Sequence, residues 1–263
     1  MGKATLYLVR HAQGFHNLNA ANHQIPDPSL TPLGEEQCHT LAKAFPATFP
    51  KAPKITHLVS SPLRRTIYTT LLSFPKEVKS GLVITALPQI QETSQLPCDT
   101  GSDSSKLVSE FGSKIDLHLV KEGWNNKQGK WSPAASAITA RARDARVWLR
   151  DLATSALAES DEDVNIVMTT HGGFLHFFTN DWLGYTTVAG TGWANTEFRA
   201  YEFGSTNDTD ASIYETEESR QRRKGHELPL TKDEQRELAN AAHMEAVQQG
   251  YLNAELTNTK LDE

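Results

Sequence analysis

The chain has 263 residues and a formal net charge of −6 at neutral pH. A net negative charge argues against general binding to nucleic acid or to anionic lipid, so we expect neither partner. It also means that a phosphate-binding site must be a local positive pocket, because the field of the whole molecule repels anions. Apolar residues make up 38% of the chain, which at this length still allows a core of ordinary size.

The cysteines and the hydropathy pattern indicate in which cellular compartment the protein is expected. Cys38 and Cys98 stand in no CxxC or Cys/His spacing, which favours two reduced thiols over a disulfide or a metal pair. The first residues, MGKATLYLVRH, hold too short an apolar run for a signal peptide. No apolar stretch approaches the roughly 20 residues of a transmembrane helix. We therefore expect a cytoplasmic protein with no membrane partner.

Short apolar runs alternate with longer amphipathic ones along the first 203 residues. In chain order they predict a strand at Thr5–Val9, a helix from the N-cap pair Thr31-Pro32 to about Ala44, a strand at Ile55–Val59 and a helix opening at Ser61-Pro62. Then follow a strand at Leu82–Ala86, a long helix over Ser136–Leu157, a strand at Val164–Met168, a helix in HGGFLHFFTNDWL and an edge strand at Glu197–Phe203. The alternation predicts an α/β three-layer sandwich, with a mostly parallel central sheet and helices on both faces.

The long helix is predicted from its three-to-four residue periodicity. Ile138, Ala142, Ala145 and Leu149 are among the residues that recur on its apolar face. Arg141, with other arginines, is assigned to the polar face.

The composition changes after about Gly204, where the chain becomes polar and charged. Thr231 to Glu234 form a capping-box pattern that opens a helix to about Gln249, with only a weak apolar stripe. We predict two parts: a catalytic domain at 1–203 and a polar, partly disordered C-terminal appendage at 204–263 that carries one helix.

Polar groups follow each of the four predicted inner strands. Arg10 and His11 follow the first, Ser60 and Ser61 the second, Glu92 the third and His171 the fourth. Ligands of such sheets bind beyond the carboxyl ends of the strands. Each of these residues alone is ordinary, but their order and placement together predict one site.

Phosphoryl transfer needs charge neutralisation, a nucleophile and a proton donor for the leaving oxygen. His11 can attack phosphorus as a neutral imidazole, and Arg10 and Arg65 can bind phosphate oxygens in forked geometry. Glu92 can protonate the leaving group and then activate water. His171 precedes Gly172 at a helix start, where the backbone approaches an anion closely.

These segments resemble the motifs of the histidine phosphatase superfamily, which has the phosphoglycerate mutase-like fold. Residues 10–17 read RHAQGFHN and resemble Arg-His-Gly-x-x-x-x-Asn, with Ala12 in place of Gly. The remaining motifs occur in the family's order and are PSLTPLGEEQ (28–37), SSPLRRT (60–66), LPQIQET (87–93) and TTHGGF (169–174).

The resemblance implies a role for each matching residue. His11 would carry the phosphohistidine, and Glu92 would act as general acid and then base. Arg10, Arg65 and His171 would bind the phosphoryl group, together with Asn17 and Gly172. It implies no metal and no cofactor, and it makes the substrate a small phosphorylated metabolite.

Alternatives stay open beside a phosphatase. Gln13 stands where many members carry Glu, and HQIPDPSL occupies the place of the Phe-Thr-Gly-Trp stretch of glycolytic mutases, so we favour hydrolysis over mutase-type transfer. A non-catalytic protein that binds a phosphorylated ligand is a further alternative. A metal hydrolase is disfavoured, because His11 and His16, like His171 and His176, are five residues apart. The oligomeric state is open.

The long interval at 93–135 follows Glu92. Either it covers the site as a lid, or it is a surface loop with two packed tryptophans. Its lysines could attract a second phosphate, but solvated side chains are the simpler interpretation; they are Lys106, Lys121, Lys127 and Lys130.

Overall fold

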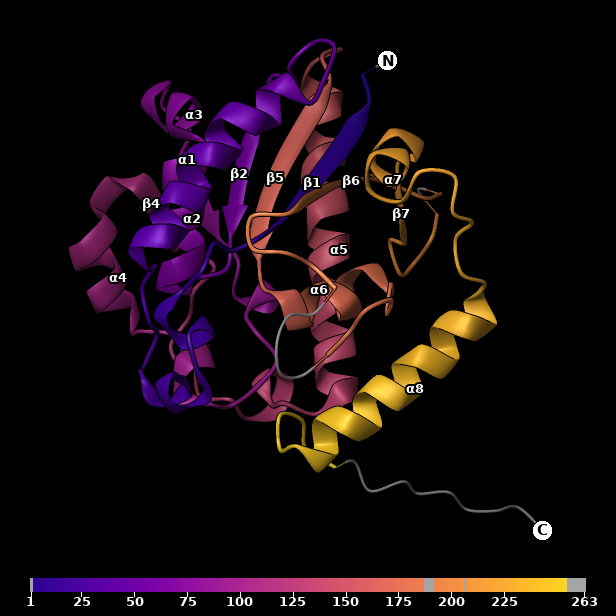
Figure 1. The fold of residues 1–263 in the computed structure, drawn as a ribbon. Coiled ribbons are helices and arrows are strands. Elements are labelled where there is room, and N and C mark those ends of the chain that lie inside the picture. Colours follow the sequence, from indigo (N-terminus) through magenta and orange to yellow (C-terminus); the bar gives the residue numbers. More distant parts are fainter. Residues whose placement is uncertain (1, 187–191, 206, 255–263) are drawn as a thin grey trace.

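A computed structural model describes residues 2–186, 192–205 and 207–254 (Figure 1). In these residues one sheet has the strand order β4-β3-β2-β5-β1-β6-β7. Its five parallel strands are β1 (Ala4–Arg10), β2 (His57–Ser60), β3 (Ile84–Ala86), β4 (Ile115–Asp116) and β5 (Val164–Thr170). Two antiparallel strands follow, β6 (Phe198–Phe203) and β7 (Ile213–Glu215). The edge position predicted for 197–203 was wrong, because β7 pairs with the outer side of β6. The predicted mostly parallel sheet is confirmed.

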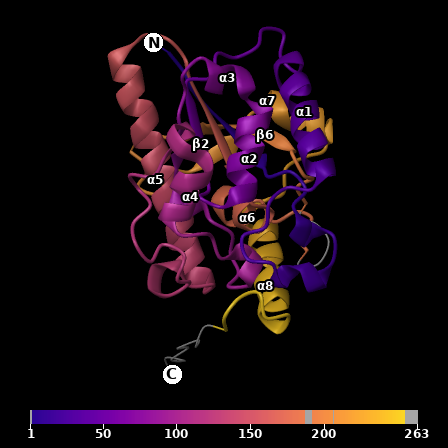
Figure 2. The ribbon, with the colours of Figure 1, turned by 90° about the vertical axis from the view of Figure 1, so that its left-hand side faces the viewer.

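Helices cover both faces of this sheet. In Figure 2, α5 (Ala135–Glu159) lies on one side of the strands, and α1 (Pro32–Ala47) and α2 (Arg64–Ser73) lie on the other. The remaining helices are α3 (Pro75–Lys79), α4 (Ser104–Phe111), α6 (Gly172–Thr179), α7 (Glu217–Lys224) and α8 (Lys232–Gln248). The predicted three-layer sandwich is therefore confirmed.

The alternation of side chains along β1 divides the core into two layers. Leu6 and Leu8 are buried in the cluster that contains α5 and α6. Tyr7 and Val9 are buried in the cluster that contains α1 and α2. A strand that is buried on both faces has a nearly continuous apolar sequence. For this reason β1 and β5 could be predicted from the sequence.

Local capping explains where two predicted helices begin. The Thr31 Oγ1 accepts a hydrogen bond from Gly34 N at 3.0 Å, and Pro32 occupies the first helical position of α1. At α8, Thr231 and Glu234 form the predicted capping box. Both helix starts are confirmed.

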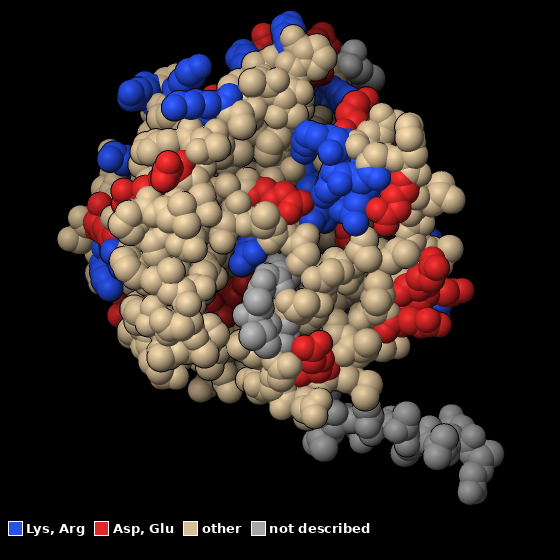
Figure 3. Space-filling model, in the orientation of Figure 1, with Lys and Arg blue, Asp and Glu red and all other residues tan. Residues whose placement is uncertain are grey.

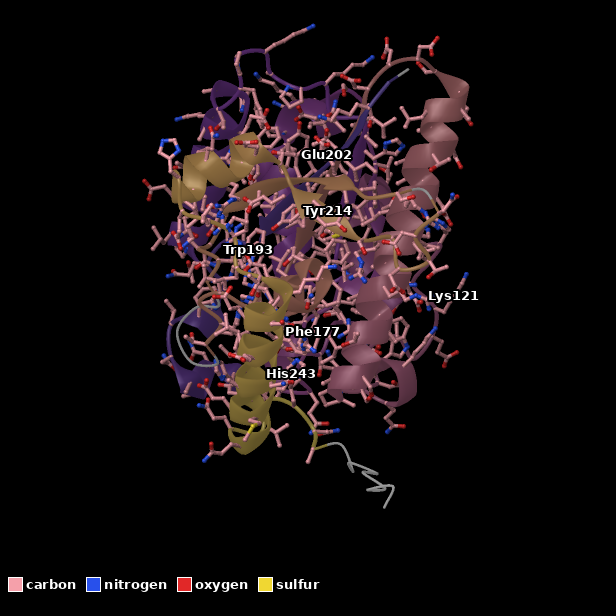
Figure 4. All side chains as sticks on the ribbon, turned by 90° about the vertical axis from the view of Figure 1, so that its right-hand side faces the viewer. Lys121, Phe177, Trp193, Glu202, Tyr214 and His243 are labelled. Atoms are coloured by element: carbon pink, nitrogen blue, oxygen red, sulfur yellow. The ribbon has the colours of Figure 1, made fainter. Side chains whose placement is uncertain are left out.

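The part of the chain after Gly204 contributes to the sheet and to the core. Strand β7 pairs with β6, and α7 follows it, so two elements beyond the expected helix occur here. From α8, the His243 ring stacks on Phe177 of α6 with centroids 5.1 Å apart (Figure 4). The division at 203/204 stays a prediction, and residues 255–263 lie outside the described part of the chain.

A basic patch at α7 is visible on the face shown in Figure 3, with acidic side chains beside it. Arg223 forms an ion pair with Glu215 at 2.6 Å, and the Arg222 guanidinium lies 4.3 Å from the centre of the Phe198 ring. These cations are thus engaged by the protein's own side chains. No helix within the described ranges is long and apolar enough to cross a membrane.

The packing of α8 can be tested at Ala246, which is fully buried against the core. We expect Ala246→Asp to lower the free energy of unfolding by at least about 2 kcal/mol, because it places an unpaired carboxylate against apolar side chains. Urea denaturation followed by circular dichroism measures the change. Met244→Asp on the same helix is the control, since Met244 is 74% exposed, and it should change stability by no more than about 0.5 kcal/mol. Equal effects of the two variants would contradict the docked position of α8.

Candidate active site

The carboxyl ends of three neighbouring parallel strands meet at one edge of the sheet. Arg10 at the end of β1 lies opposite Thr170 of β5, and Ser60 of β2 lies opposite Thr169. The residues that follow these strands therefore come together. The predicted clustering at the strand ends is observed for His11 and His171, whose ring centroids lie 5.3 Å apart.

His11 is buried and held in one tautomer. Its Nδ1 lies 2.7 Å from the carbonyl oxygen of Ala12, which can only accept, so Nδ1 carries the proton and Nε2 keeps its lone pair. Burial, followed by the charges of Arg65 and other neighbours, holds the pKa of His11 well below its usual range. The imidazole is therefore neutral at physiological pH and suited to attack phosphorus.

Two buried guanidinium groups approach this histidine. Arg65, from the first turn of α2, donates from Nη1 to Cys98 O at 2.6 Å and from Nη2 to Asp99 Oδ1 at 2.9 Å. Arg10 donates from Nη1 to Trp193 O. The Nε atoms of Arg10 and Arg65 are buried and have no hydrogen-bond partner within the described residues. An unmet buried donor costs about 1–3 kcal/mol, so both groups favour an anionic ligand.

His171 is the N-cap of α6 and lies between a donor and a hydroxyl group. Arg65 Nη2 lies 3.0 Å from Nδ1, and because a guanidinium only donates, Nδ1 is the acceptor. The proton of the neutral ring is then on Nε2, 2.8 Å from Ser61 Oγ. Burial is the main cause that lowers the pKa of His171 well below its usual range.

Glu92 lies against the start of α6. Its Oε1 accepts from the amides of Thr93 at 2.9 Å and Phe174 at 3.0 Å, and its Oε2 accepts from Gly173 N at 3.3 Å. A Cβ at Gly173 would come within 2.7 Å of Oε1, so this glycine makes room for the carboxyl group. Burial, with the charge of Asp99 next, raises the pKa of Glu92. A carboxyl group of this kind keeps its proton to a higher pH than an ordinary glutamate does.

The segment that carries Glu92 is fixed by two buried cations that were expected to be solvated. Arg141 of α5 donates from Nη1 to the carbonyls of Gln89 at 2.6 Å and Gln91 at 2.9 Å. Lys127 donates from Nζ to Glu92 O at 3.2 Å, and burial lowers the pKa of Lys127 to about 7.

The predictions that Arg141 and Lys127 are exposed to solvent were both wrong, for different reasons. Arg141 is spaced three residues from Ile138 and four from Ala145, so the period of the helix already placed it on the apolar face. Lys127 lies in the polar run NNKQGK, which gives no sign of burial. Whether residues 93–135 act as a lid stays a prediction.

Asp99 is a site residue that sequence reasoning missed. Its Oδ1 binds Arg65, and its Oδ2 accepts from Ser94 Oγ at 2.5 Å. It lies 34 residues after Arg65 along the chain, in a short 3-10 turn at Pro97–Asp99. A contact this distant has no local sequence signal.

The roles of the two remaining predicted phosphate ligands stay predictions. Asn17 is exposed, and its Oδ1 accepts from Gly14 N at 3.0 Å; no described hydrogen bond joins it to the other site residues. Gly172 is buried at the first position of α6, next to His171. In the described part of the chain, no group of three or more His, Cys, Asp or Glu side chains is arranged to hold a metal ion.

The site thus combines a neutral buried imidazole, two buried arginines with unmet donors and a carboxyl group of raised pKa, a set that phosphoryl transfer could use. A family model described as Histidine phosphatase superfamily (branch 1) matches residues 6–209. The chain belongs to this superfamily, which confirms the family and the enzyme class that the motifs predicted.

Curated relatives agree with this assignment, and a solved structure agrees with the fold. The chain is 30% identical over 173 residues to Putative phosphoserine phosphatase 2 of Hydrogenobacter thermophilus. This match covers 65% of this chain and 74% of that protein. It is 39% identical over 80 residues to Phosphoglycerate mutase-like protein 1 of Arabidopsis thaliana, and this match covers only 28% of each chain. The structure of Mycobacterial hydrolase 2 has a TM-score of 0.51 and 17% identity over 92% of this chain and 99% of the other, which supports the fold.

The two arginines of SSPLRRT allow a matched test of phosphate binding. We expect inorganic phosphate to raise the melting temperature of the protein and of Arg64→Ala, because Arg64 is engaged with Glu110 at 2.8 Å. Arg65→Ala should lose this shift, since it removes the buried fork. Thermal melts with and without phosphate, each compared with the variant's own baseline, measure the effect. A full shift in Arg65→Ala would contradict the assignment.

Proposed function

We propose that this protein is a metal-independent phosphatase that hydrolyses a phosphomonoester through a phosphohistidine on His11, with Glu92 as general acid and then base. The observation that carries the proposal is the tautomer of His11. With its Nδ1 proton bound to Ala12 O and its pKa lowered by burial, the ring presents Nε2 as an unprotonated nucleophile.

The first step transfers the phosphoryl group to the enzyme. His11 Nε2 forms a bond to phosphorus while the bond from phosphorus to the substrate oxygen breaks. The raised pKa of Glu92 supports a protonated carboxyl group, which gives its proton to the leaving oxygen. Arg10 and Arg65 neutralise the charge on the transferred oxygens.

The second step returns the enzyme to its starting state. Glu92, now a carboxylate, takes a proton from water as the water oxygen attacks phosphorus. The bond between phosphorus and Nε2 breaks, and inorganic phosphate leaves with His11 neutral again. A binding protein has no use for such an acid, so a site that keeps Glu92 in place favours turnover over mere recognition.

The substrate we propose is a small phosphorylated metabolite, in line with the phosphoserine phosphatase named among the relatives. We also propose a cytoplasmic location. The two cysteines are free and buried, which supports a reducing compartment.

Replacement of His11 tests the nucleophile. We expect His11→Ala to abolish phosphate release from 4-nitrophenyl phosphate without added metal, because the variant lacks the proposed nucleophile. A screen over sugar phosphates, phosphoglycerates, nucleotides and phosphopeptides, with a colorimetric phosphate assay, identifies the substrate. His39→Ala, at an exposed histidine of α1, is the control and should keep full activity. Full activity in His11→Ala would overturn the mechanism.

Replacement of Glu92 separates its two roles. For alkyl phosphates, we expect Glu92→Gln to lower kcat about 10²–10⁴-fold, since the leaving alkoxide needs a proton. With 4-nitrophenyl phosphate the first step should survive, so the variant should release one nitrophenol per site in a burst and retain phosphohistidine. Rapid-quench kinetics measure the burst. A similar loss for both leaving groups, with no burst, would contradict the acid role.

The pH dependence of kcat/KM tests whether Glu92 acts in its protonated form. Glu92 must be protonated in the free enzyme, so kcat/KM should fall as pH rises through its raised pKa, above the usual range of a glutamate. Glu92→Gln should lack this alkaline limb. The acid limb should lie well below the usual range of histidine, because burial lowers the pKa of His11.

A further inference from the structure

One histidine of the first motif has no role in the mechanism above. His16 lies in a 3-10 turn at Phe15–Asn17, directly after the nucleophile's loop. Its neighbours Phe15 and Leu18 are 40% and 52% exposed, whereas His16 is 8% exposed. The turn therefore directs a polar ring inward and leaves an apolar ring outside, which is the reverse of the usual preference.

The ring of His16 is seated beside the nucleophile. Its centroid lies 5.3 Å from that of His11, so His16, His11 and His171 form a row of three imidazoles. A Cβ at Gly14 would come within 2.8 Å of the His16 Cε1 and Nδ1 atoms. The glycine thus leaves the space that the ring occupies, and any other residue there would displace the ring.

One nitrogen of this ring makes no hydrogen bond to the described part of the protein. The Nδ1 of His16 is buried and has no hydrogen-bond partner within residues that the structure describes. Such an atom costs about 1–3 kcal/mol unless a ligand satisfies it. The Nε atoms of Arg10 and Arg65 also have no hydrogen-bond partner in the described part of the chain. The charges of both arginines act on His11, so these guanidinium groups lie near the nucleophile.

The charges around His16 locate it near the anion site. Burial lowers its pKa to about 2, and the next causes are Arg65 and then Arg10, with His23 the remaining group. Both phosphate-binding arginines therefore lie close enough to act on the ring. A neutral imidazole has one N–H to donate and adds no positive charge to a pocket that already holds two guanidinium groups.

We propose that His16 is a further catalytic residue, whose ring donates a hydrogen bond to an oxygen of the phosphoryl group bound at His11. This inference rests on the proposed phosphatase function. In the transition state the charge spreads over three equatorial oxygens, and each needs a donor in place beforehand. Arg10 and Arg65 supply the first donors from their unpartnered Nε atoms, and His16 adds one from the side of the nucleophile's own loop. No proton is transferred from His16, because Glu92 performs that step.

The test separates the shape of the His16 side chain from its ability to donate a hydrogen bond. His16→Phe keeps a ring in the space that Gly14 leaves but removes the donor, and we expect kcat/KM to fall about 10²-fold, as for other single transition-state donors. His16→Asn places an amide near Nδ1 and His16→Gln places one near Nε2, so one of them should recover at least about tenfold. His39→Phe is the control at an exposed histidine and should stay within twofold of the parent.

Two inhibitors give a measurement that a structural role would not change. Vanadate mimics the five-coordinate transition state, and inorganic phosphate mimics the product. In His16→Phe the inhibition constant of vanadate should rise in parallel with the loss of kcat/KM, while that of phosphate rises less. The melting temperature of each variant is recorded beside these constants.

The possible results decide the proposal in each case. Unchanged kcat/KM and vanadate inhibition in His16→Phe would overturn it. So would an equal loss in all three variants together with a lower melting temperature, because His16 would then only support the fold. If the parent protein releases no phosphate from any substrate, the proposed function fails, and direct calorimetric binding of vanadate still decides the role of His16. Equal vanadate affinity of the parent and His16→Phe would then overturn it.

Discussion

The rest of the site depends on the buried ion pair between Arg65 and Asp99. The charge of the Arg65 guanidinium contributes to the low pKa values of His11, His16 and His171, and it opposes the rise in the pKa of Glu92. A buried cation needs a counter-charge, which Asp99 supplies at 2.9 Å. The same carboxylate also raises the pKa of Glu92, so one ion pair acts on both the proposed nucleophile and the proposed acid. A bound phosphoryl group would add the negative charge that the pocket still lacks.

The sequence was most informative where a feature is local. Continuous apolar runs marked β1 and β5, and the pair Thr31-Pro32 marked the start of α1, because burial on two faces and end-capping each leave a signature within a few residues. The strand-end placement of His11 and His171 was predictable for the same reason. Asp99 and Lys127 were not, since their partners Arg65 and Glu92 are about 35 residues away and nothing in the chain specifies that separation. Strand β4, with only two residues, is too short to show any period.

In the C-terminal part, tertiary contacts stabilise a helix whose own apolar stripe is weak. Helix α8 has an apolar stripe made largely of alanine, yet His243 stacks on Phe177, and Trp182 N donates to Gln235 at 2.8 Å. Beyond α8, Asn253 N donates to Pro133 O at 3.0 Å, at the start of the region of α5. The Tyr251 ring lies 6.4 Å from that of His23, in the loop that also carries His16. Residues after the predicted boundary at 203/204 thus contact two segments that precede it.

Burial is the largest of several opposing effects on the pKa of Glu92. The amides of Gly173 and Phe174, at the positive end of α6, donate to the carboxylate, and the bond from Gly173 is among the causes that lower its pKa. Arg65 acts in the same direction, whereas burial and Asp99 act in the other and prevail. The balance suits a group that must hold a proton in one step and lose it in the next. If burial alone acted, the carboxyl group would not ionise readily enough to serve as a base; if the amides alone acted, it would hold no proton to give.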